Sequence, residues 1–405
     1  MTSEKALLPQ SSLRLSWELI DDDLGLKRAV TELAAHDGPF ALDTERASGY
    51  RYFSRAYLIQ IKRGDSAIFL IDPIEILDLE PLRELLNQSE WILHSAPHDL
   101  PCLAELGLRP KKLFDTELAG RLLGKKRTAL GKLVAEVLHV QLEKKFSDVD
   151  WSLRPLHHEW LEYAAIDVEF LADIRENFIA AAKKQNKTEI FAEEFAALLE
   201  WQPKPKRADQ WRRTSHITKV NGDNRALAIV KELWLARDAL AREMDVEPTL
   251  LLRDSAIIAA AEKRPRSEND LVRMRDFRGT AARTEAGRWW RAIRKGKQST
   301  EILKHPPERG DSEASLRRLL TGRDADPVLR KRLTRGREII AEIADEMAIQ
   351  PENLLEPAVL KRLIVRPPET PDLESLNSAL RELGARNWQV EAISQKLRLI
   401  FVDSN

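Results

Sequence analysis

The sequence predicts an α/β domain followed by an all-α region. Short β-like runs alternate with helical segments over the first 200 residues, whereas strand signals almost vanish beyond residue 218. The chain has 405 residues, which is too long for a single ordinary core. We therefore predict an N-terminal tail, an α/β domain, a linker and two helical domains, at residues 1–13, 14–200, 201–218, 219–300 and 309–405.

Five short apolar runs in the first half are predicted strands because of their length and composition. They are LSWELI, PFALDTE, AYLIQIK, AIFLID and WILH, which begin at Leu15, Pro39, Ala56, Ala67 and Trp91. The second, third and fourth runs are close in sequence. We expect them to be neighbours in one mixed sheet.

Helical patterns lie between and after these strands. Three acidic residues can cap a helix over residues 21–36, and Glu80 followed by proline suits a helix start. Another helix is predicted to begin at Pro97 and to carry Asp99. A long helical periodicity follows Pro155 and reaches residue 184.

The segment from Trp201 to Thr218 differs from both flanking regions. It contains two prolines and five lysines or arginines but a single acidic residue, Asp209. Prolines discourage regular structure, so we predict a basic linker.

The helical region contains a weak internal repeat. A segment from Arg242 aligns with a segment from Ala344, matching Pro248 to Pro351 and two leucines to two leucines. Each segment follows an amphipathic helix. Two copies of one small helical unit are therefore expected.

Composition limits the class of protein. No apolar run has the length of a membrane span and the N-terminus lacks a signal-peptide core, so we expect a cytoplasmic protein without a membrane partner. The only cysteine, Cys102, excludes an intrachain disulfide and is predicted to be a packed helix residue. Because the formal net charge is zero, nucleic-acid binding would depend on local basic patches.

Four carboxylates and one tyrosine lie at the edges of apolar segments, where an unpaired charge is costly. Asp43 and Glu45 leave the same face of a strand, and Tyr163 and Asp167 share one face of a helix. Asp99 lies near a helix start. Each motif alone is better explained as a solvated or packed residue, but divalent cations would make the whole group tolerable.

The order of these residues resembles that of the DEDD exonuclease superfamily, whose fold is RNase H-like with a mixed central sheet. The tyrosine is typical of its DEDDy branch, because the histidine branch would need a histidine where Glu162 stands. The segments ALDTE, LIQI, LIDP, LFDTELAG, DWSLRPL and EYAAIDVEFL resemble the ribonuclease D family. The two helical units resemble its paired HRDC (helicase and RNase D C-terminal) domains.

The resemblance implies a 3′–5′ exoribonuclease that removes nucleoside 5′-monophosphates from RNA 3′ ends by two-metal-ion hydrolysis. Asp43, Glu45, Asp99 and Asp167 would hold two Mg²⁺ or Mn²⁺ ions. Tyr163 would orient the attacking water, because a phenol with a pKa of about 10 is a poor base. The expected substrates are tRNA precursors with a free 3′ end, and we expect a monomer.

Other residues are candidates for contact with RNA. Arg46 follows the DTE motif where an aromatic residue is common, and it could contact phosphates. Trp151 could stack on a base or belong to the core, and Arg154 could hold a phosphate. Asp115 is better explained as a helix cap than as a supporting acid. Further basic candidates are Lys183, Lys184, Lys187, the linker, Arg288, Arg291, Arg294, Lys295 and Lys297 with Trp289 and Trp290, and Arg330, Lys331, Arg332, Arg335 and Arg337.

Two other functions remain open at this point. HRDC modules occur in DNA helicases and related nucleases trim DNA, so a 3′–5′ DNA exonuclease is one alternative. A catalytically silent nucleic-acid-binding module is the other. The presence of all five motif residues argues against the silent module.

Overall fold

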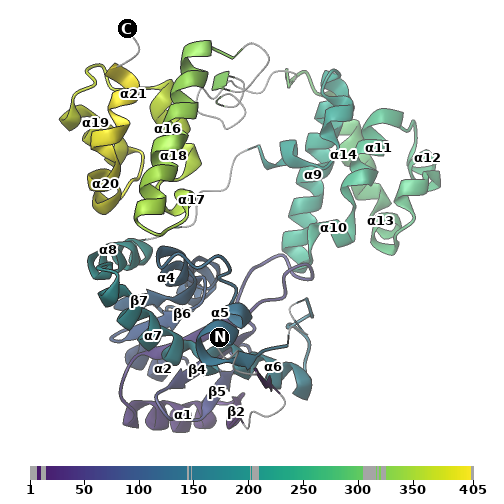
Figure 1. Cartoon of the computed structure of the whole chain (residues 1–405). Helices are drawn as coiled ribbons and strands as arrows, with labels where there is room; N and C mark the ends of the chain where they lie inside the picture. Colours follow the sequence, from purple (N-terminus) through teal and green to yellow (C-terminus); the bar gives the residue numbers. More distant parts are fainter. Residues whose placement is uncertain are drawn as a thin grey trace.

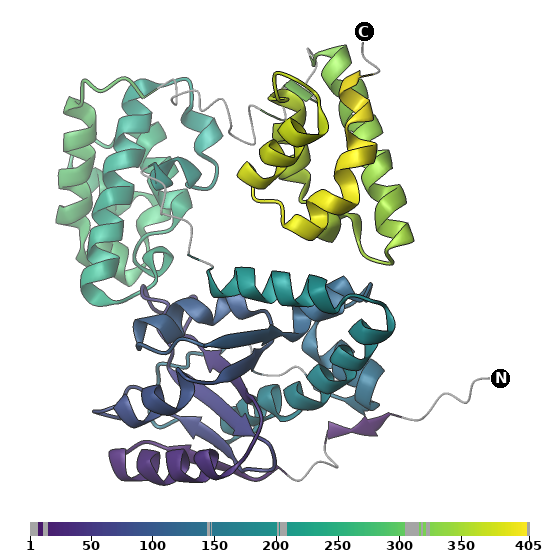
Figure 2. The ribbon, with the colours of Figure 1, turned by 90° about the vertical axis from the view of Figure 1, so that its left-hand side faces the viewer.

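The protein consists of an α/β domain and two helical domains (Figures 1 and 2). The structure is a computed structural model and describes residues 7–10, 15–143, 146, 148–200, 202, 209–303, 316, 319–320 and 325–402. Most of the predicted N-terminal tail lies outside these residues. Its described part includes β1 (Leu8–Pro9), which pairs in parallel with β8 (Val140–Gln141). None of the described helices is both long and apolar enough to cross a membrane.

A six-stranded mixed sheet forms the centre of the α/β domain, in the order β2-β5-β4-β3-β6-β7. The five predicted strands are confirmed as β2 (Trp17–Ile20), β3 (Phe40–Glu45), β4 (Leu58–Arg63), β5 (Ile68–Ile71) and β6 (Glu90–Leu93). As expected, β3, β4 and β5 are neighbours in one mixed sheet, and the structure shows that both pairs are antiparallel. The strand β7 (Lys112–Asp115), which runs directly into a helix, was not predicted.

Alternation along β3 separates two cores. Phe40 and Leu42 enter the core beneath α1 (Asp23–Ala35) and α2 (Glu80–Leu86), whereas Ala41 faces the opposite core. Asp43 and Glu45 therefore belong to the face of Ala41. That face is covered by α6 (His158–Glu169), which packs on β3, β4 and β5.

The remaining helices agree with the sequence in most places. The helix α1 is capped by Asp22 and ends before His36, and α2 begins at Glu80, as predicted. The long helix predicted after Pro155 is divided at Phe170 into α6 and α7. The others are α3 (Leu100–Glu105), α4 (Thr116–Leu122), α5 (Leu130–Leu138), α7 (Leu171–Lys184) and α8 (Thr188–Leu199).

The first helical domain begins inside the segment that was predicted to be a linker. Residues 201 and 203–208, with both prolines and three of the basic residues, lie outside the described part of the chain. From Gln210 the backbone forms two short 3₁₀ helices, and Trp211 is buried in the core of the first helical domain. The arginine that follows, Arg212, donates to the carbonyl of Leu303 at 3.0 Å. The second half of the predicted linker is therefore part of a folded domain.

The internal repeat is confirmed by geometry. In the first domain, α9 (Asn224–Met244) is followed by Asp245 at positive φ, α10 (Pro248–Leu251) and α11 (Asp254–Lys263). In the second, α16 (Pro327–Glu346) is followed by Ala348 at positive φ, α17 (Pro351–Leu354) and α18 (Pro357–Val365). The first domain continues with α12 (Glu268–Arg273), α13 (Thr280–Thr284) and α14 (Ala286–Gln298), and the second with α19 (Leu373–Glu382), α20 (Asn387–Leu397) and α21 (Leu399–Val402).

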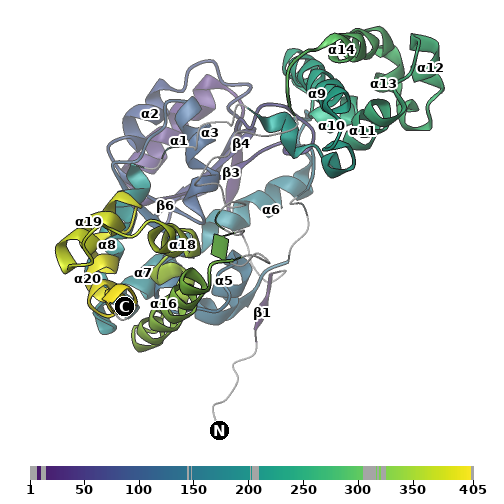
Figure 3. The ribbon, with the colours of Figure 1, turned by 90° about the horizontal axis from the view of Figure 1, so that it is seen from above.

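Both helical domains contact the α/β domain through this repeated turn, at separate places (Figure 3). Asp245 accepts a hydrogen bond from the backbone of Phe53, at 3.1 Å, in the loop after β3. The carbonyl of Ala348 accepts from Lys187 at 3.3 Å and lies against Gly124, where any Cβ would collide with it. One hydrophobic cluster also continues from the α/β domain into the second helical domain.

Candidate active site

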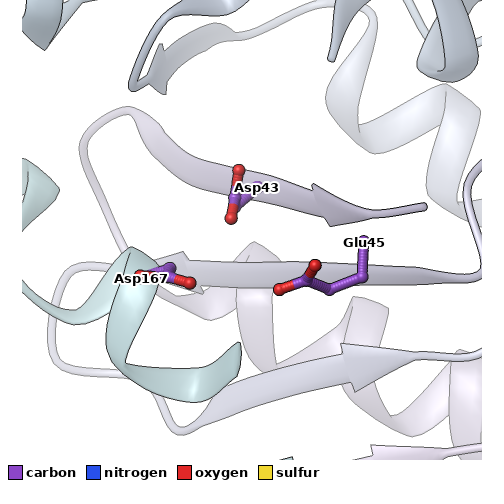
Figure 4. Close-up of side chains that lie close together, drawn as sticks. All are labelled: Asp43, Glu45 and Asp167. Carbon is purple, nitrogen blue, oxygen red and sulfur yellow. The ribbon is translucent and has the colours of Figure 1, made fainter. Parts of the chain in front are cut away.

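Three of the predicted carboxylates converge on one point of the sheet. Asp43 and Glu45 project from β3, and Asp167 projects from α6 toward them (Figure 4). One oxygen from each of the three lies within 4.8 Å of the others. The shared strand face of Asp43 and Glu45 was predicted from their spacing, and the structure brings Asp167 to it.

The helix α6 is held in place on this face by packing and by one ion pair. Its own residues Leu161, Ala164 and Ala165 are buried against the domain. Glu169, two residues beyond Asp167, accepts from Lys62 of β4 at 2.6 Å. The backbone of Asp167 is therefore held by packing before it in the helix and by the ion pair after it.

The electrostatics of the cluster favour a cation. Burial, followed by repulsion from Asp99 and Asp167, raises the pKa of Asp43 well above its ordinary value. Burial and repulsion from the same two aspartates also raise the pKa of Glu45. Divalent cations would offset both effects, and hard ions such as Mg²⁺ prefer an all-oxygen set of ligands. The residues present therefore fit a divalent-metal site.

Asp99 lies beside this group but is not one of the three. It precedes α3, after a short 3₁₀ helix (Ala96–His98), so the prediction of one helix from Pro97 through Asp99 is wrong. Its Oδ1 accepts from the hydroxyl of Thr44 at 2.7 Å. Burial raises the pKa of Asp99 to about 6, although Thr44 and Arg46 act in the other direction.

Tyr163 is half-buried one helical turn before Asp167, and its ring meets that of Phe146 edge-on, with 6.0 Å between the centroids. Burial raises the pKa of its phenol, and repulsion from Asp167, Glu45 and other acids adds to this effect. The phenol is therefore protonated at neutral pH and can donate a hydrogen bond. This supports orientation of water, rather than proton abstraction, as its role.

Two of the candidates for RNA contact, Trp151 and Arg154, have structural partners, and for Trp151 the core alternative is confirmed. Trp151 is fully buried, with its ring 5.7 Å from that of Trp160, so it cannot stack on a base. Arg154 donates to Asp72 at 2.7 Å and to the carbonyl of Tyr57 at 2.9 Å. Its guanidinium therefore stabilises the fold, and because the side chain is 22% exposed, a phosphate contact stays a prediction.

Arg46 has a different environment. Its guanidinium donates to the carbonyl of His98 and lies 3.9 Å from Asp99. It is partly exposed, so an RNA contact stays a prediction. The Asp115 side chain accepts from the backbone of Glu117 and Leu118 and also from that of Ser95 and Ala96, which confirms the cap.

Cys102 is a packed helix residue, as predicted. It is 1% exposed, and burial raises the pKa of its thiol to about 11.

Among the candidates for RNA contact that are far from the carboxylates, some residues are buried and others are exposed. Lys187 is buried between domains, so its prediction as an RNA contact is wrong. Lys183 and Lys184 are exposed at the end of α7. Trp289 is a core residue, whereas Trp290 lies 5.3 Å from the ammonium of Lys297.

Sequence reasoning missed one polar residue in the cluster, Gln60 of β4. It lies directly opposite Asp43 in the antiparallel pair and donates to Glu45 at 3.5 Å. A signal was available, because Gln60 is the only polar residue within the apolar run YLIQI and alternation places it on the face of Asp43.

Comparisons with known proteins agree with this geometry. Residues 17–180 match the family described as 3′–5′ exonuclease, and residues 226–293 match the HRDC domain. Residues 321–399 match a model described as the 3′ to 5′ exonuclease C-terminal domain. The fold and the site therefore define a 3′–5′ exonuclease with helical C-terminal domains, although the number of HRDC domains stays a prediction.

Individual relatives narrow the class. Ribonuclease D of Pseudomonas paraeruginosa is 30% identical over 273 residues, which cover 66% of this chain and 71% of the relative. The chain belongs to the ribonuclease D family. A crystal structure of a protein from Bifidobacterium adolescentis is 32% identical and covers 98% of this chain and 99% of its own, with a TM-score of 0.87. Escherichia coli RNase D, at 21% identity, has the same fold, with a TM-score of 0.67 over 96% of this chain and 99% of its own.

Proposed function

We propose that the protein is a divalent-metal-dependent 3′–5′ exoribonuclease that releases nucleoside 5′-monophosphates one at a time. The observation that carries this proposal is the approach of the carboxylates of Asp43, Glu45 and Asp167 to within 4.8 Å on one sheet face. Membership of the ribonuclease D family supports RNA as the substrate. In more detail, we propose that its substrates are the 3′ ends of tRNA precursors. We also propose that it acts in the cytoplasm and as a monomer.

Asp43, Glu45 and Asp167 would hold two Mg²⁺ or Mn²⁺ ions, with Asp99 turning toward them as a fourth ligand. Bound cations of this kind supply a nucleophilic water at neutral pH and stabilise the leaving oxygen of an in-line displacement. Tyr163 donates a hydrogen bond that orients the attacking water, because its phenol stays protonated. The burial of the acids strengthens each of these interactions.

The test compares Asp43→Asn and Asp167→Asn with a matched control, Glu84→Gln, which alters an exposed acid on α2. Each protein is incubated with 5′-labelled RNA and with DNA of the same sequence, with Mn²⁺ or with EDTA. We expect stepwise shortening of the RNA from its 3′ end by the wild type and the control only, and none in EDTA.

Each outcome decides between the candidates. Full activity in either aspartate variant would remove the site assignment. Preferential digestion of the DNA would favour the DNA exonuclease. A wild-type protein that binds RNA but does not shorten it would be the silent binding module.

A further inference from the structure

We propose that Gln60 is a positioning residue of the metal site, which orients Glu45 and holds a water of the hydrated cations. The inference rests on the proposed function and names a residue of this chain that the carboxylate motif does not contain. It concerns an uncharged amide placed inside a cluster of acids.

The sheet aims the Gln60 side chain at the cluster. In the antiparallel register Gln60 faces Asp43 across β4 and β3, while Leu70 of β5 lies on its other side. Leu70 is apolar and fully buried, so it offers no hydrogen-bonding group from its side chain. The polar surroundings of the amide are therefore on the side of the carboxylates.

The amide is buried but only half satisfied. Gln60 is 0% exposed, and its Nε2 donates to the carboxylate of Glu45 at 3.5 Å. Within the part of the chain that the structure describes, its Oε1 has no hydrogen-bond partner. A buried acceptor without a donor is costly, so such atoms usually mark a place for water or a ligand.

The chemistry of an amide suits both tasks. Its N–H fixes one oxygen of Glu45 without neutralising the negative charge that a cation needs. Its carbonyl can accept from a water of the cation without adding another negative charge to the cluster, which a glutamate would do. Lys62 lies two residues further along the same face, but its ammonium pairs with Glu169. Gln60 is therefore the residue of β4 that we assign to Glu45 and the water.

This role differs from ordinary packing in what its loss would change. A packing residue contributes to the stability of the metal-free protein. A residue that supports the ligands of a metal contributes to metal affinity, and removal of such a partner typically costs about 10- to 100-fold. Removal of the Gln60 amide takes away an unsatisfied acceptor and one long hydrogen bond, of 3.5 Å, to Glu45, so it should cost the metal-free fold little.

The experiment measures Mn²⁺ affinity by calorimetry, and the melting temperature in EDTA, for the wild type, Gln60→Leu and Leu58→Met. Leu58 is a matched control because it is fully buried on the same strand and in the core on the same side. We expect Gln60→Leu to bind Mn²⁺ about 10- to 100-fold more weakly with a metal-free melting temperature that is unchanged or higher. Leu58→Met should keep the wild-type affinity.

Other results would overturn the inference or the function separately. Equal affinities of the wild type and Gln60→Leu, or a weaker affinity accompanied by a lower metal-free melting temperature in both Gln60→Leu and Gln60→Met, would make Gln60 a packing residue. The unbranched Gln60→Met replaces Gln60→Leu if the latter does not fold. Absence of Mn²⁺ binding by the wild type would instead defeat the proposed function.

Discussion

Replacement of Asp99 by asparagine should stabilise the metal-free protein, although it removes a proposed metal ligand. Asp99 is 2% exposed, and its pKa is raised from 3.8 to about 6, chiefly by burial. The asparagine amide would keep an oxygen that can accept from Thr44, so the hydrogen bond at 2.7 Å need not be lost. The variant therefore removes a charge while it preserves the local contact.

The magnitude follows from the difference between the folded and unfolded pKa values of Asp99. A shift of about two pH units corresponds to about 3 kcal/mol, because each unit is worth about 1.4 kcal/mol. The folded pKa is raised, so the penalty is absent below the unfolded pKa, grows between about pH 4 and 6, and is complete above the folded pKa. We expect a gain of about 3 kcal/mol at pH 8 and about half of it at pH 5.

The assay is urea unfolding of the wild type, Asp99→Asn and the exposed control Glu84→Gln, in EDTA at both pH values. The same measurement with saturating Mn²⁺ should reverse the order, because the wild type then gains more from binding. A loss of stability in Asp99→Asn at pH 8 without metal, or a gain that is independent of pH, would refute the reasoning. The loss would mean that ionised Asp99 is stabilised by its surroundings, and the pH-independent gain would mean that the effect does not come from its ionisation.

Three further predictions concern the site, Lys187 and Arg154. Mn²⁺ should bind more tightly as the pH rises from 5.5 to 8, because the raised pKa values make protons compete with the metal, and calorimetry that shows no such trend would contradict this. Lys187→Met should lower the free energy of unfolding by about 1–3 kcal/mol, because the Ala348 carbonyl loses its donor, whereas the exposed Lys183→Met should not. Arg154→Met should cost about 3–5 kcal/mol in urea unfolding, because the buried Asp72 loses its cationic partner; an unchanged stability with a raised KM for RNA would instead favour the phosphate-binding role.

The sequence predicted the centre of the fold well because local signals and tertiary packing agree there. Apolar runs of four to seven residues identified five strands, and the spacing of Asp43 and Glu45 placed both on one face. The repeat was found because the order of helix, turn, proline and leucines recurs in full. In each of these places a short-range pattern determines the backbone.

The errors arise where a side chain is used by distant parts of the chain. Arg154 and Lys187 look like free cations in the sequence, but their partners are 82 and 161 residues away. Trp151 could not be assigned to the core without the packing of α6. Gln60 has a local signal, yet its meaning depends on the neighbouring strand.

The contacts of α8 have a consequence for any attempt to isolate the catalytic half. Glu193 accepts from the backbone N–H of Trp388 at 3.1 Å, and Glu194 accepts from the indole of Trp388 at 2.8 Å. A protein shortened after Leu199 would lose these donors, and the part of the shared hydrophobic cluster that lies in the α/β domain would lose its partners from the second helical domain. Such a fragment is expected to aggregate or to be digested by proteases, so its inactivity would say little about RNA capture by the missing half.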